Sequence, residues 1–154
     1  MFRQRMEYMR SVPEPVCFLC TDAGTDDLEG NFILQRNELC LIVLNRYPYN
    51  SGHLLVSPLR HVGELEELTK EELDELLAAT MRAMAALRAA MEPEGFNVGA
   101  NLGSAAGAGV PGHLHMHVVP RWSGDTNLMP VLAETKVLPE GLEQTYGSLR
   151  PHFR

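Results

Sequence analysis

One stretch of the chain, residues 68–91, has the apolar spacing of a long amphipathic helix, and this single element limits how the rest can fold. Its apolar residues recur three or four positions apart, and we expect them to face the core: Leu73, Leu76, Leu77, Met81, Met84, Leu87 and Met91. Thr69, followed three residues later by Glu72, predicts a capping box at the start of this helix. Pro93 and Gly95 predict its end.

Short apolar runs flank this helix on both sides. Residues 32–36, 39–45 and 53–58 precede it, and residues 96–103 and 113–120 follow it. Turn residues separate the first three runs, which is typical of consecutive antiparallel strands. Three strands, a helix and two strands predict an α+β fold, in which one long helix packs on an antiparallel sheet of five strands. The 154 residues, 45% of them hydrophobic, suit one such domain.

The net charge excludes one broad class of function. At −7 the chain lacks the basic surface of a general nucleic-acid binder, so an anionic ligand would have to be held locally. No apolar run approaches the roughly 20 residues of a membrane span, and residues 1–12 lack the apolar core of a signal peptide. We therefore expect a cytoplasmic protein that contacts neither nucleic acid nor membrane.

Three histidines alternate along the last predicted strand. His113, His115 and His117 should share one face of it, about 7 Å apart along the strand. A structural strand seldom displays imidazoles in a row, whereas nucleophilic, acid–base and metal chemistry near neutral pH all use histidine. The preceding loop, residues 104–112, contains Gly107 and Gly109, whose backbone N–H groups can hold phosphate oxygens.

The run HLHMHVV, residues 113–119, resembles the motif of the histidine triad (HIT) nucleotide hydrolases and transferases. Residues 45–62, NRYPYNSGHLLVSPLRHV, resemble the upstream asparagine, turn and Gly-His strand of that family. The resemblance covers about residues 30–125 and is strongest to the diadenosine polyphosphate hydrolase and phosphorylase branch. It implies a single HIT domain over residues 1–154, with an N-terminal segment 1–29, a C-terminal extension 126–154, and a homodimeric assembly.

The resemblance also implies roles for individual residues. His115 matches the nucleophile that becomes nucleotidylated, and His117 and His53 match the histidines that complete the catalytic cluster. Asn45 matches a position on the ribose side and Asn101 one that donates to the phosphate. Gly107 and Gly109 of the small-residue loop are candidates for holding the phosphate, and Trp122 either stacks on a base or fills the core. The implied substrate is a nucleotide or dinucleoside polyphosphate such as diadenosine tetraphosphate, with magnesium as a possible companion of the nucleotide. Residues 107–112 of the loop, GAGVPG, lack the glutamine and the hydroxyl residue that family members usually have there. The loop can therefore leave room for inorganic phosphate, in place of water, as the acceptor of the nucleotidyl group.

Cys17 and Cys20 form a C-x-x-C pair, which serves either metal binding or redox chemistry. Zinc needs four ligands, and the resemblance implies that His61 and His113 supply the other two to a structural site. No organic cofactor is expected. Three alternatives stay open: a phosphoramidase with the same nucleophile, a non-catalytic nucleotide-binding or partner-binding module, and a catalytic metal held by the three alternating histidines.

Overall fold

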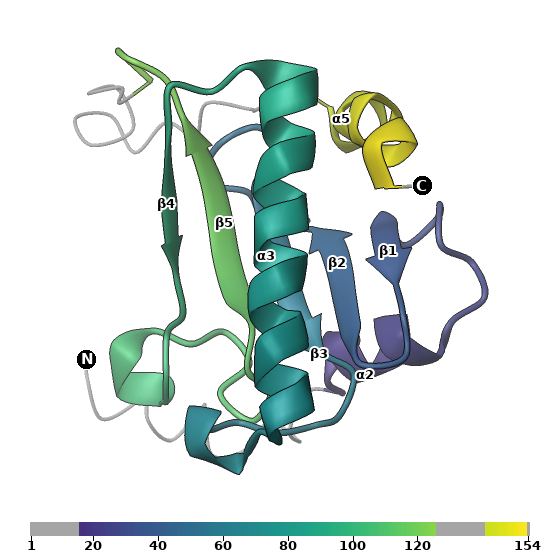
Figure 1. The fold of residues 1–154 in the computed structure, drawn as a ribbon, viewed down its shortest axis with the longest axis vertical. Helices are drawn as coiled ribbons and strands as arrows, with labels where there is room; N and C mark the ends of the chain where they lie inside the picture. Colours follow the sequence, from purple (N-terminus) through teal and green to yellow (C-terminus); the bar gives the residue numbers. More distant parts are fainter. Residues whose placement is uncertain (1–15, 126–140, 154) are drawn as a thin grey trace, which may run out of the picture.

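The computed structural model describes residues 16–125 and 141–153, which form a five-stranded sheet with a long helix on one face (Figure 1). The strands are β1 (Ile33–Arg36), β2 (Cys40–Leu44), β3 (Leu54–Pro58), β4 (Gly95–Gly99) and β5 (Met116–Arg121), and the helix is α3 (Lys70–Met91). Their order across the sheet is β1-β2-β3-β5-β4, and the described pairs are antiparallel. The predicted α+β architecture is confirmed.

Shorter helical segments complete the described parts of the chain. They are α2 (Phe18–Gly24), α5 (Leu142–Leu149) and the 3-10 turns η1 (Leu65–Glu67), η2 (Ser104–Ala106) and η3 (Arg150–Phe153). Of the helices within residues 16–125 and 141–153, none has both the length and the apolar content that crossing a membrane requires.

The predicted capping box at the start of α3 is confirmed. The Thr69 hydroxyl accepts from the Glu72 backbone N–H at 3.1 Å, and the Glu72 carboxylate accepts from the Thr69 N–H at 2.8 Å. Arg60 donates twice to the same carboxylate, at 2.8 Å each, and these bonds lower the pKa of Glu72 to about 2. The helix start is therefore tied to the segment that follows β3.

Small side chains carry much of the contact between α3 and the sheet. The buried residues of the helix include Leu76, Ala79, Ala83, Ala86 and Leu87, and they pack against Ile42, Leu54, Val56 and Val118 of the sheet. The prediction that all seven large apolar residues face the core is wrong for Leu73, Leu77 and Met81, which are 39%, 52% and 64% exposed. The stripe of Ala79, Ala83 and Ala86 lets the helix approach the sheet closely. The neighbouring stripe of Leu73, Leu77 and Met81 therefore faces outward.

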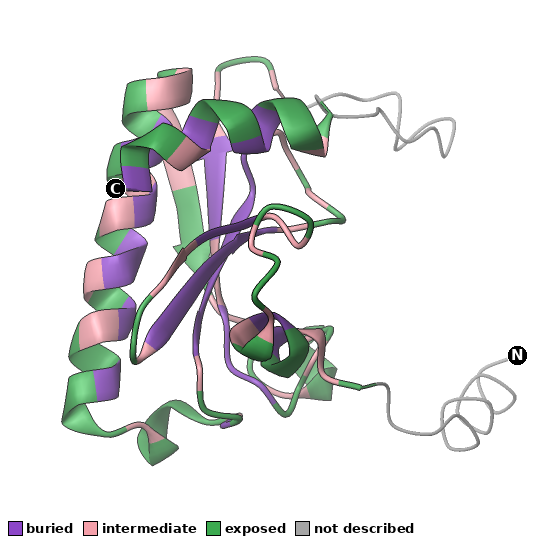
Figure 2. Ribbon diagram, turned by 90° about the vertical axis from the view of Figure 1, so that its right-hand side faces the viewer, coloured by how far each residue is buried: buried purple, intermediate pink, exposed green. Residues whose placement is uncertain are grey.

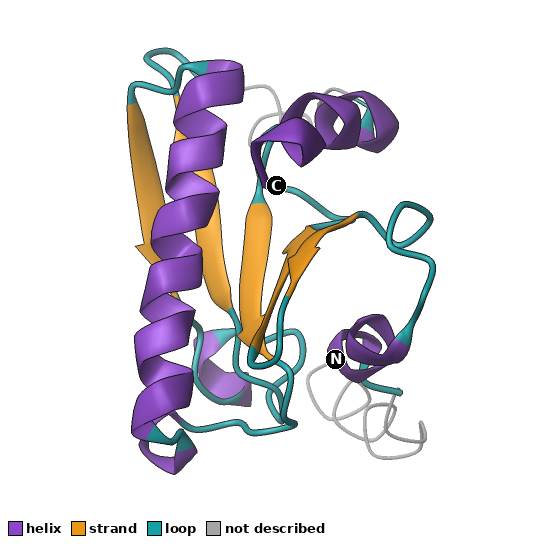
Figure 3. Ribbon diagram, turned by 45° about the vertical axis from the view of Figure 1, so that its right-hand side comes forward, coloured by secondary structure: helices purple, strands orange, loops and turns teal. Residues whose placement is uncertain are grey.

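The C-terminal helix α5 was not predicted from the sequence. Tyr146, Leu149 and Phe153 bury their side chains in the same core as α3, and the Tyr146 hydroxyl donates to the Ile33 carbonyl at 3.0 Å. Figure 3 shows α5 above β1 and beside α3. The part of the expected C-terminal extension at residues 126–140, and residues 1–15 of the expected N-terminal segment, lie outside the described residues.

The two faces of the sheet are covered differently. Leu54, Val56 and Val118 point toward α3, so the alternating residues, including Leu55 and His117, point to the opposite face. On that face Leu19 of α2 packs with Ile33, Leu41, Val43 and Leu55 in a second, smaller core. Figure 2 shows α2 across the sheet from α3.

Candidate active site

Three histidines meet on the face of the sheet opposite α3. His53 Nε2 lies 2.9 Å from His117 Nδ1, and the ring centroids of His115 and His117 are 5.0 Å apart. His53 is fully buried and His115 is almost so. The predicted catalytic trio His53, His115 and His117 is therefore brought together from segments more than 60 residues apart in the chain.

Only one of the three alternating histidines lies within the strand. β5 begins at Met116, so His113 and His115 lie in the irregular segment before it, and the prediction of three imidazoles in a row on one strand is wrong. The paired register of β5 with β3 starts at Val56 and Met116, and β3 ends at Pro58. Pro58 has no N–H for a ladder bond, and its carbonyl instead accepts from His113 Nε2 at 2.8 Å.

A tight turn delivers His53 to the cluster. Gly52 precedes it at φ +81°, and a Cβ there would lie 2.8 Å from Met91 Sδ and 3.0 Å from a Leu87 methyl carbon. The His53 N–H donates to the Asn50 carbonyl at 3.1 Å, and the His53 carbonyl accepts from the Asn45 N–H at 2.9 Å. Because the left-handed backbone and the close contact both need glycine, the Gly-His pair is a local requirement of this fold.

Hydrogen bonds assign the tautomers of His53 and His117. The Tyr49 backbone N–H lies 3.1 Å from His53 Nδ1, so this nitrogen accepts and the proton is on Nε2. His53 Nε2–H then donates to His117 Nδ1, which leaves the His117 proton on Nε2. Burial lowers the pKa of His53 to about 3, with smaller contributions from His117 and His115. Burial and then His115 lower the pKa of His117, so both rings are neutral near pH 7.

A hydrogen bond to one ring nitrogen fixes the orientation of His115. Its Nδ1 lies 2.9 Å from the backbone carbonyl of His113, which can only accept. The proton of the neutral ring is therefore on Nδ1, and Nε2 keeps a lone pair. A neutral imidazole fixed in this tautomer is a nucleophile, and the Nε2–H of His117 beside it is a hydrogen-bond donor.

The predicted nucleotide-binding residues differ in how they are placed relative to the cluster. Asn45 lies against His53, with its Nδ2 3.3 Å from His53 Nδ1. Asn101 comes two residues after Gly99, which pairs with His117 across β4 and β5. In the following loop the Gly107 N–H donates to the Ser104 carbonyl at 3.1 Å and so closes the turn η2. That N–H is engaged in the turn in this conformation, and Gly109 lies two residues further along.

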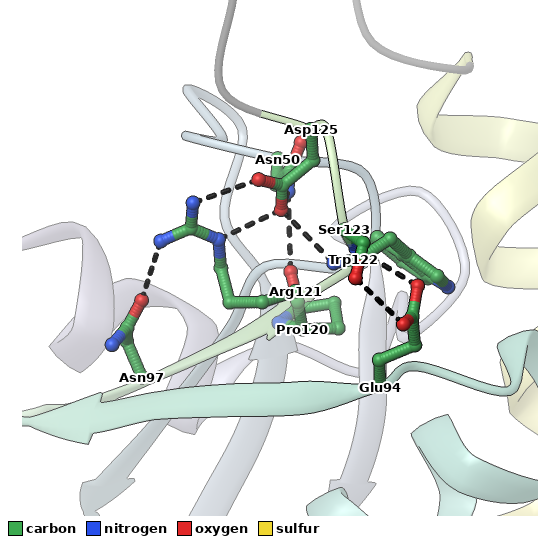
Figure 4. Close-up of polar contacts among 8 residues, drawn as sticks. All are labelled: Asn50, Glu94, Asn97, Pro120, Arg121, Trp122, Ser123 and Asp125. Carbon is green, nitrogen blue, oxygen red and sulfur yellow. Dashed lines mark hydrogen bonds and ion pairs between the residues drawn. The ribbon is translucent and has the colours of Figure 1, made fainter.

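Trp122 stands apart from the histidines. It follows β5, five residues beyond His117, which corresponds to about 17 Å along a strand. Figure 4 shows it in a polar network in which its backbone N–H donates to Asp125 at 3.0 Å. Asp125 also accepts from Arg121 and, at 2.8 Å, from Asn50, while the Asn50 amide donates to the Pro120 carbonyl at 3.2 Å. The network anchors the turn before His53 to the end of β5.

A second cluster lies at the other end of the histidine segment. Cys17, Cys20, His61 and His113 each present one ligand atom, and these four atoms lie within 4.8 Å of one another. His113 Nδ1 is 3.3 Å from Cys17 Sγ, and His61 Nδ1 is 3.2 Å from Cys20 Sγ. The bond from His113 Nε2 to Pro58 leaves Nδ1 directed at the thiols. Two thiols and two imidazoles at this spacing are a donor set that suits zinc.

This separation weakens the hypothesis of a catalytic metal on the alternating histidines. His113 belongs to the cysteine cluster, and His53 and His117 direct facing nitrogens at each other.

Tyr49 lies in the turn before His53, and sequence analysis did not identify it as a residue that contacts the histidine cluster. Its ring stacks on His53, with centroids 5.1 Å apart and an angle of 18° between the planes. The sequence feature that could have identified Tyr49 is its position, four residues before His53.

Residues 29–124 match the family model described as the HIT domain. A Mycobacterium tuberculosis protein named AP-4-A phosphorylase is 48% identical over 117 residues, which cover 76% of this chain and 60% of that protein. A Schizosaccharomyces pombe protein named bis(5'-nucleosyl)-tetraphosphatase (asymmetrical) is 30% identical over 120 residues, 78% of this chain and 62% of that protein. The match therefore spans about three-fifths of the length of these two curated relatives.

The fold is shared with solved structures. The crystal structure of a Zn-bound histidine triad family protein from Mycobacterium smegmatis superposes with a TM-score of 0.73 at 27% identity. The superposition covers 90% of this chain and 93% of that chain.

Proposed function

The chain belongs to the HIT domain family, and we propose that it cleaves dinucleoside polyphosphates such as diadenosine tetraphosphate by nucleotidyl transfer through His115. The observation that carries this proposal is the fixed tautomer of His115, whose Nδ1 is bonded to the His113 carbonyl while Nε2 keeps its lone pair. The 48% identity to a protein named AP-4-A phosphorylase supports the substrate class and inorganic phosphate as the acceptor.

In the first step His115 Nε2 attacks the α-phosphorus. A P–N bond forms, the bridging P–O bond breaks, and the electron pair leaves on the bridging oxygen of the departing nucleotide. The His117 Nε2–H donates a hydrogen bond to that oxygen as its negative charge develops. A polyphosphate is stable as an anion, so the departing nucleotide needs no full proton. The His113 carbonyl stabilises the cationic ring of nucleotidyl-His115 through Nδ1–H.

In the second step an acceptor attacks the same phosphorus from the side opposite the P–N bond, and the electron pair of that bond returns to Nε2. Inorganic phosphate already carries anionic oxygens and needs no general base, which favours phosphorolysis. The products would then be ADP from the transferred nucleotidyl group and ATP as the departing nucleotide. Water as acceptor would give AMP and ATP.

We assign the substrate contacts from the positions of the predicted binding residues relative to the histidine cluster. Asn45, beside His53, would bind the ribose of the transferred nucleotide, and Asn101 and Gly109 would bind its phosphate. Gly107 would contribute an N–H only after the turn η2 opens, and Trp122 would reach a base only if bound nucleotide extended to the end of β5. Magnesium would arrive with the polyphosphate.

The test is incubation with diadenosine tetraphosphate, with and without inorganic phosphate, followed by chromatography of the products. We expect ADP and ATP in the presence of phosphate. His115→Ala should abolish turnover, whereas His152→Ala, a change at an exposed histidine of η3, is the matched control and should retain it. AMP and ATP without phosphate would reassign the protein as a hydrolase, and turnover by His115→Ala would overturn the proposed nucleophile.

We also propose that Cys17, Cys20, His61 and His113 hold a structural zinc ion. The donor set and its 4.8 Å spread support this, as does the superposition on a protein titled as Zn-bound. Zinc there would join α2 to the segments that follow β3 and precede β5, and would fix the His113 carbonyl that orients His115. Cysteines that bind a metal ion, and are not paired in disulfides, are typical of a reducing compartment, and we propose that this compartment is the cytoplasm.

A homodimer is the assembly we propose. Leu73, Leu77 and Met81 form an exposed apolar stripe on α3, and Val98 of the edge strand β4 is 44% exposed. An apolar stripe and an unpaired strand edge are features that a second copy of the chain can cover.

A further inference from the structure

An exposed aromatic ring stands beside the buried histidine cluster. Tyr49 is 77% exposed, although one face of its ring stacks on His53, which is fully buried. The ring also lies 6.3 Å from that of His117, at an angle of 41°. The opposite face of the Tyr49 ring is therefore open to solvent beside the histidine cluster.

The turn that carries Tyr49 is held in place. Its backbone N–H donates to His53, and the next residue, Asn50, donates to Pro120 and to Asp125. Figure 4 shows this anchor of Asn50 on the end of β5. An aromatic side chain on a fixed turn loses little conformational entropy on binding, which suits it to hold a planar ligand.

Tyr49 lies on one particular side of the reacting atoms. The ring centroids of His115 and His117 are 5.0 Å apart, those of His117 and His53 are 5.1 Å apart, and Tyr49 stacks on the outer member, His53. Tyr49 therefore lies beside His117, the proposed donor to the bridging oxygen, as well as beside His53. A polyphosphate that leaves His115 past His117 would lead toward Tyr49.

We propose that the open face of Tyr49 stacks on the base of the departing nucleotide and thereby selects dinucleoside over mononucleoside polyphosphates. This inference rests on the proposed function, because it assigns the second base of the same substrate. Stacking on an aromatic ring tolerates any base, so Tyr49 would favour a second base without choosing its identity.

The experiment compares diadenosine tetraphosphate with adenosine 5'-tetraphosphate, which has the same phosphate chain but lacks the second nucleoside. We expect Tyr49→Ala to lower kcat/KM for the dinucleotide about tenfold and to change that for the mononucleotide by less than about twofold. Tyr49→Phe keeps the ring and should retain the preference. Tyr47→Ala is the matched control, since Tyr47 is 80% exposed in the same turn and contacts Asn45 through its backbone N–H.

Binding provides a readout that does not depend on turnover. Dissociation constants of both nucleotides are measured with His115→Ala and with the His115→Ala, Tyr49→Ala double variant. The double variant should bind the dinucleotide about tenfold more weakly, and the mononucleotide equally well.

The outcomes separate the two proposals. If the wild type cleaves neither nucleotide, the proposed function fails, and the binding arm alone decides on Tyr49. If both nucleotides are cleaved and Tyr49→Ala lowers both rates equally, Tyr49 only supports His53 and the inference is wrong. Equal losses together with a change in oligomeric state, measured by light scattering, would make Tyr49 an interface residue and would also overturn it.

Discussion

Acid should destabilise this protein through one buried histidine. Burial lowers the pKa of His53 from 6.5 to about 3, because the ring is fully enclosed and faces His117. The unfolded chain binds a proton at this residue below pH 6.5, whereas the folded chain does not bind it until about pH 3. Stability is therefore complete above pH 6.5 and falls as the pH drops through the interval between these values.

The magnitude follows from the two pKa values. Between pH 7.5 and pH 5 the unfolded state gains most of one proton at this site, which lowers the free energy of unfolding by about 2 kcal/mol. His53→Gln removes the titrating group and keeps an acceptor and a donor near Tyr49 and His117. Every other ionisable group is the same in the two proteins, so the difference between the two pH dependences reports the effect of replacing His53.

The assay is urea unfolding followed by circular dichroism at several pH values between 5 and 7.5. The wild type should lose about 2 kcal/mol more than His53→Gln over this range, whatever the two absolute stabilities are. Parallel pH dependences would refute the reasoning, because they would mean that folding does not change the proton affinity of His53.

Three further predictions concern other parts of the fold. Gly52→Ala should destabilise the protein by roughly 1–3 kcal/mol, seen in urea unfolding, because a Cβ would meet Met91 and the backbone is left-handed; an unchanged midpoint would contradict this. Removing metal with a chelator should lower the melting temperature and release about one zinc per chain by atomic absorption, and Cys20→Ala, which removes a proposed ligand, should no longer respond to the chelator. Leu77→Glu should convert a dimer to a monomer in light scattering while the circular dichroism spectrum of the folded chain is retained, since Leu77 is 52% exposed in the single chain; a dimer that survives this change would argue against the α3 stripe as its interface.

The sequence predicted that three strands, a long helix and two further strands follow one another along the chain, but not the order of the strands across the sheet. Alternation, turn residues and the capping box are local patterns, and each corresponds to an element that the structure contains. The helix α5 was not predicted, because its apolar residues are few and follow a sequence segment without clear periodicity. Tyr49 escaped because a turn sequence does not tell where a side chain points.

The sequence by itself determined which residues could react: the alternating histidines, the Gly-His pair and the C-x-x-C pair, since their chemistry is a property of the side chains. Only the tertiary structure decided which of these residues belong to the cysteine–histidine cluster and which to the histidine cluster of the candidate active site. His113 joins Cys17 and Cys20, because Pro58 ends β3 and its carbonyl accepts from His113 Nε2. His53 joins His117, which lies 64 positions away in the chain. The same holds for α3, where periodicity defines two neighbouring apolar stripes. Close packing of alanines on the sheet selects the one that is buried, and no local pattern contains that information.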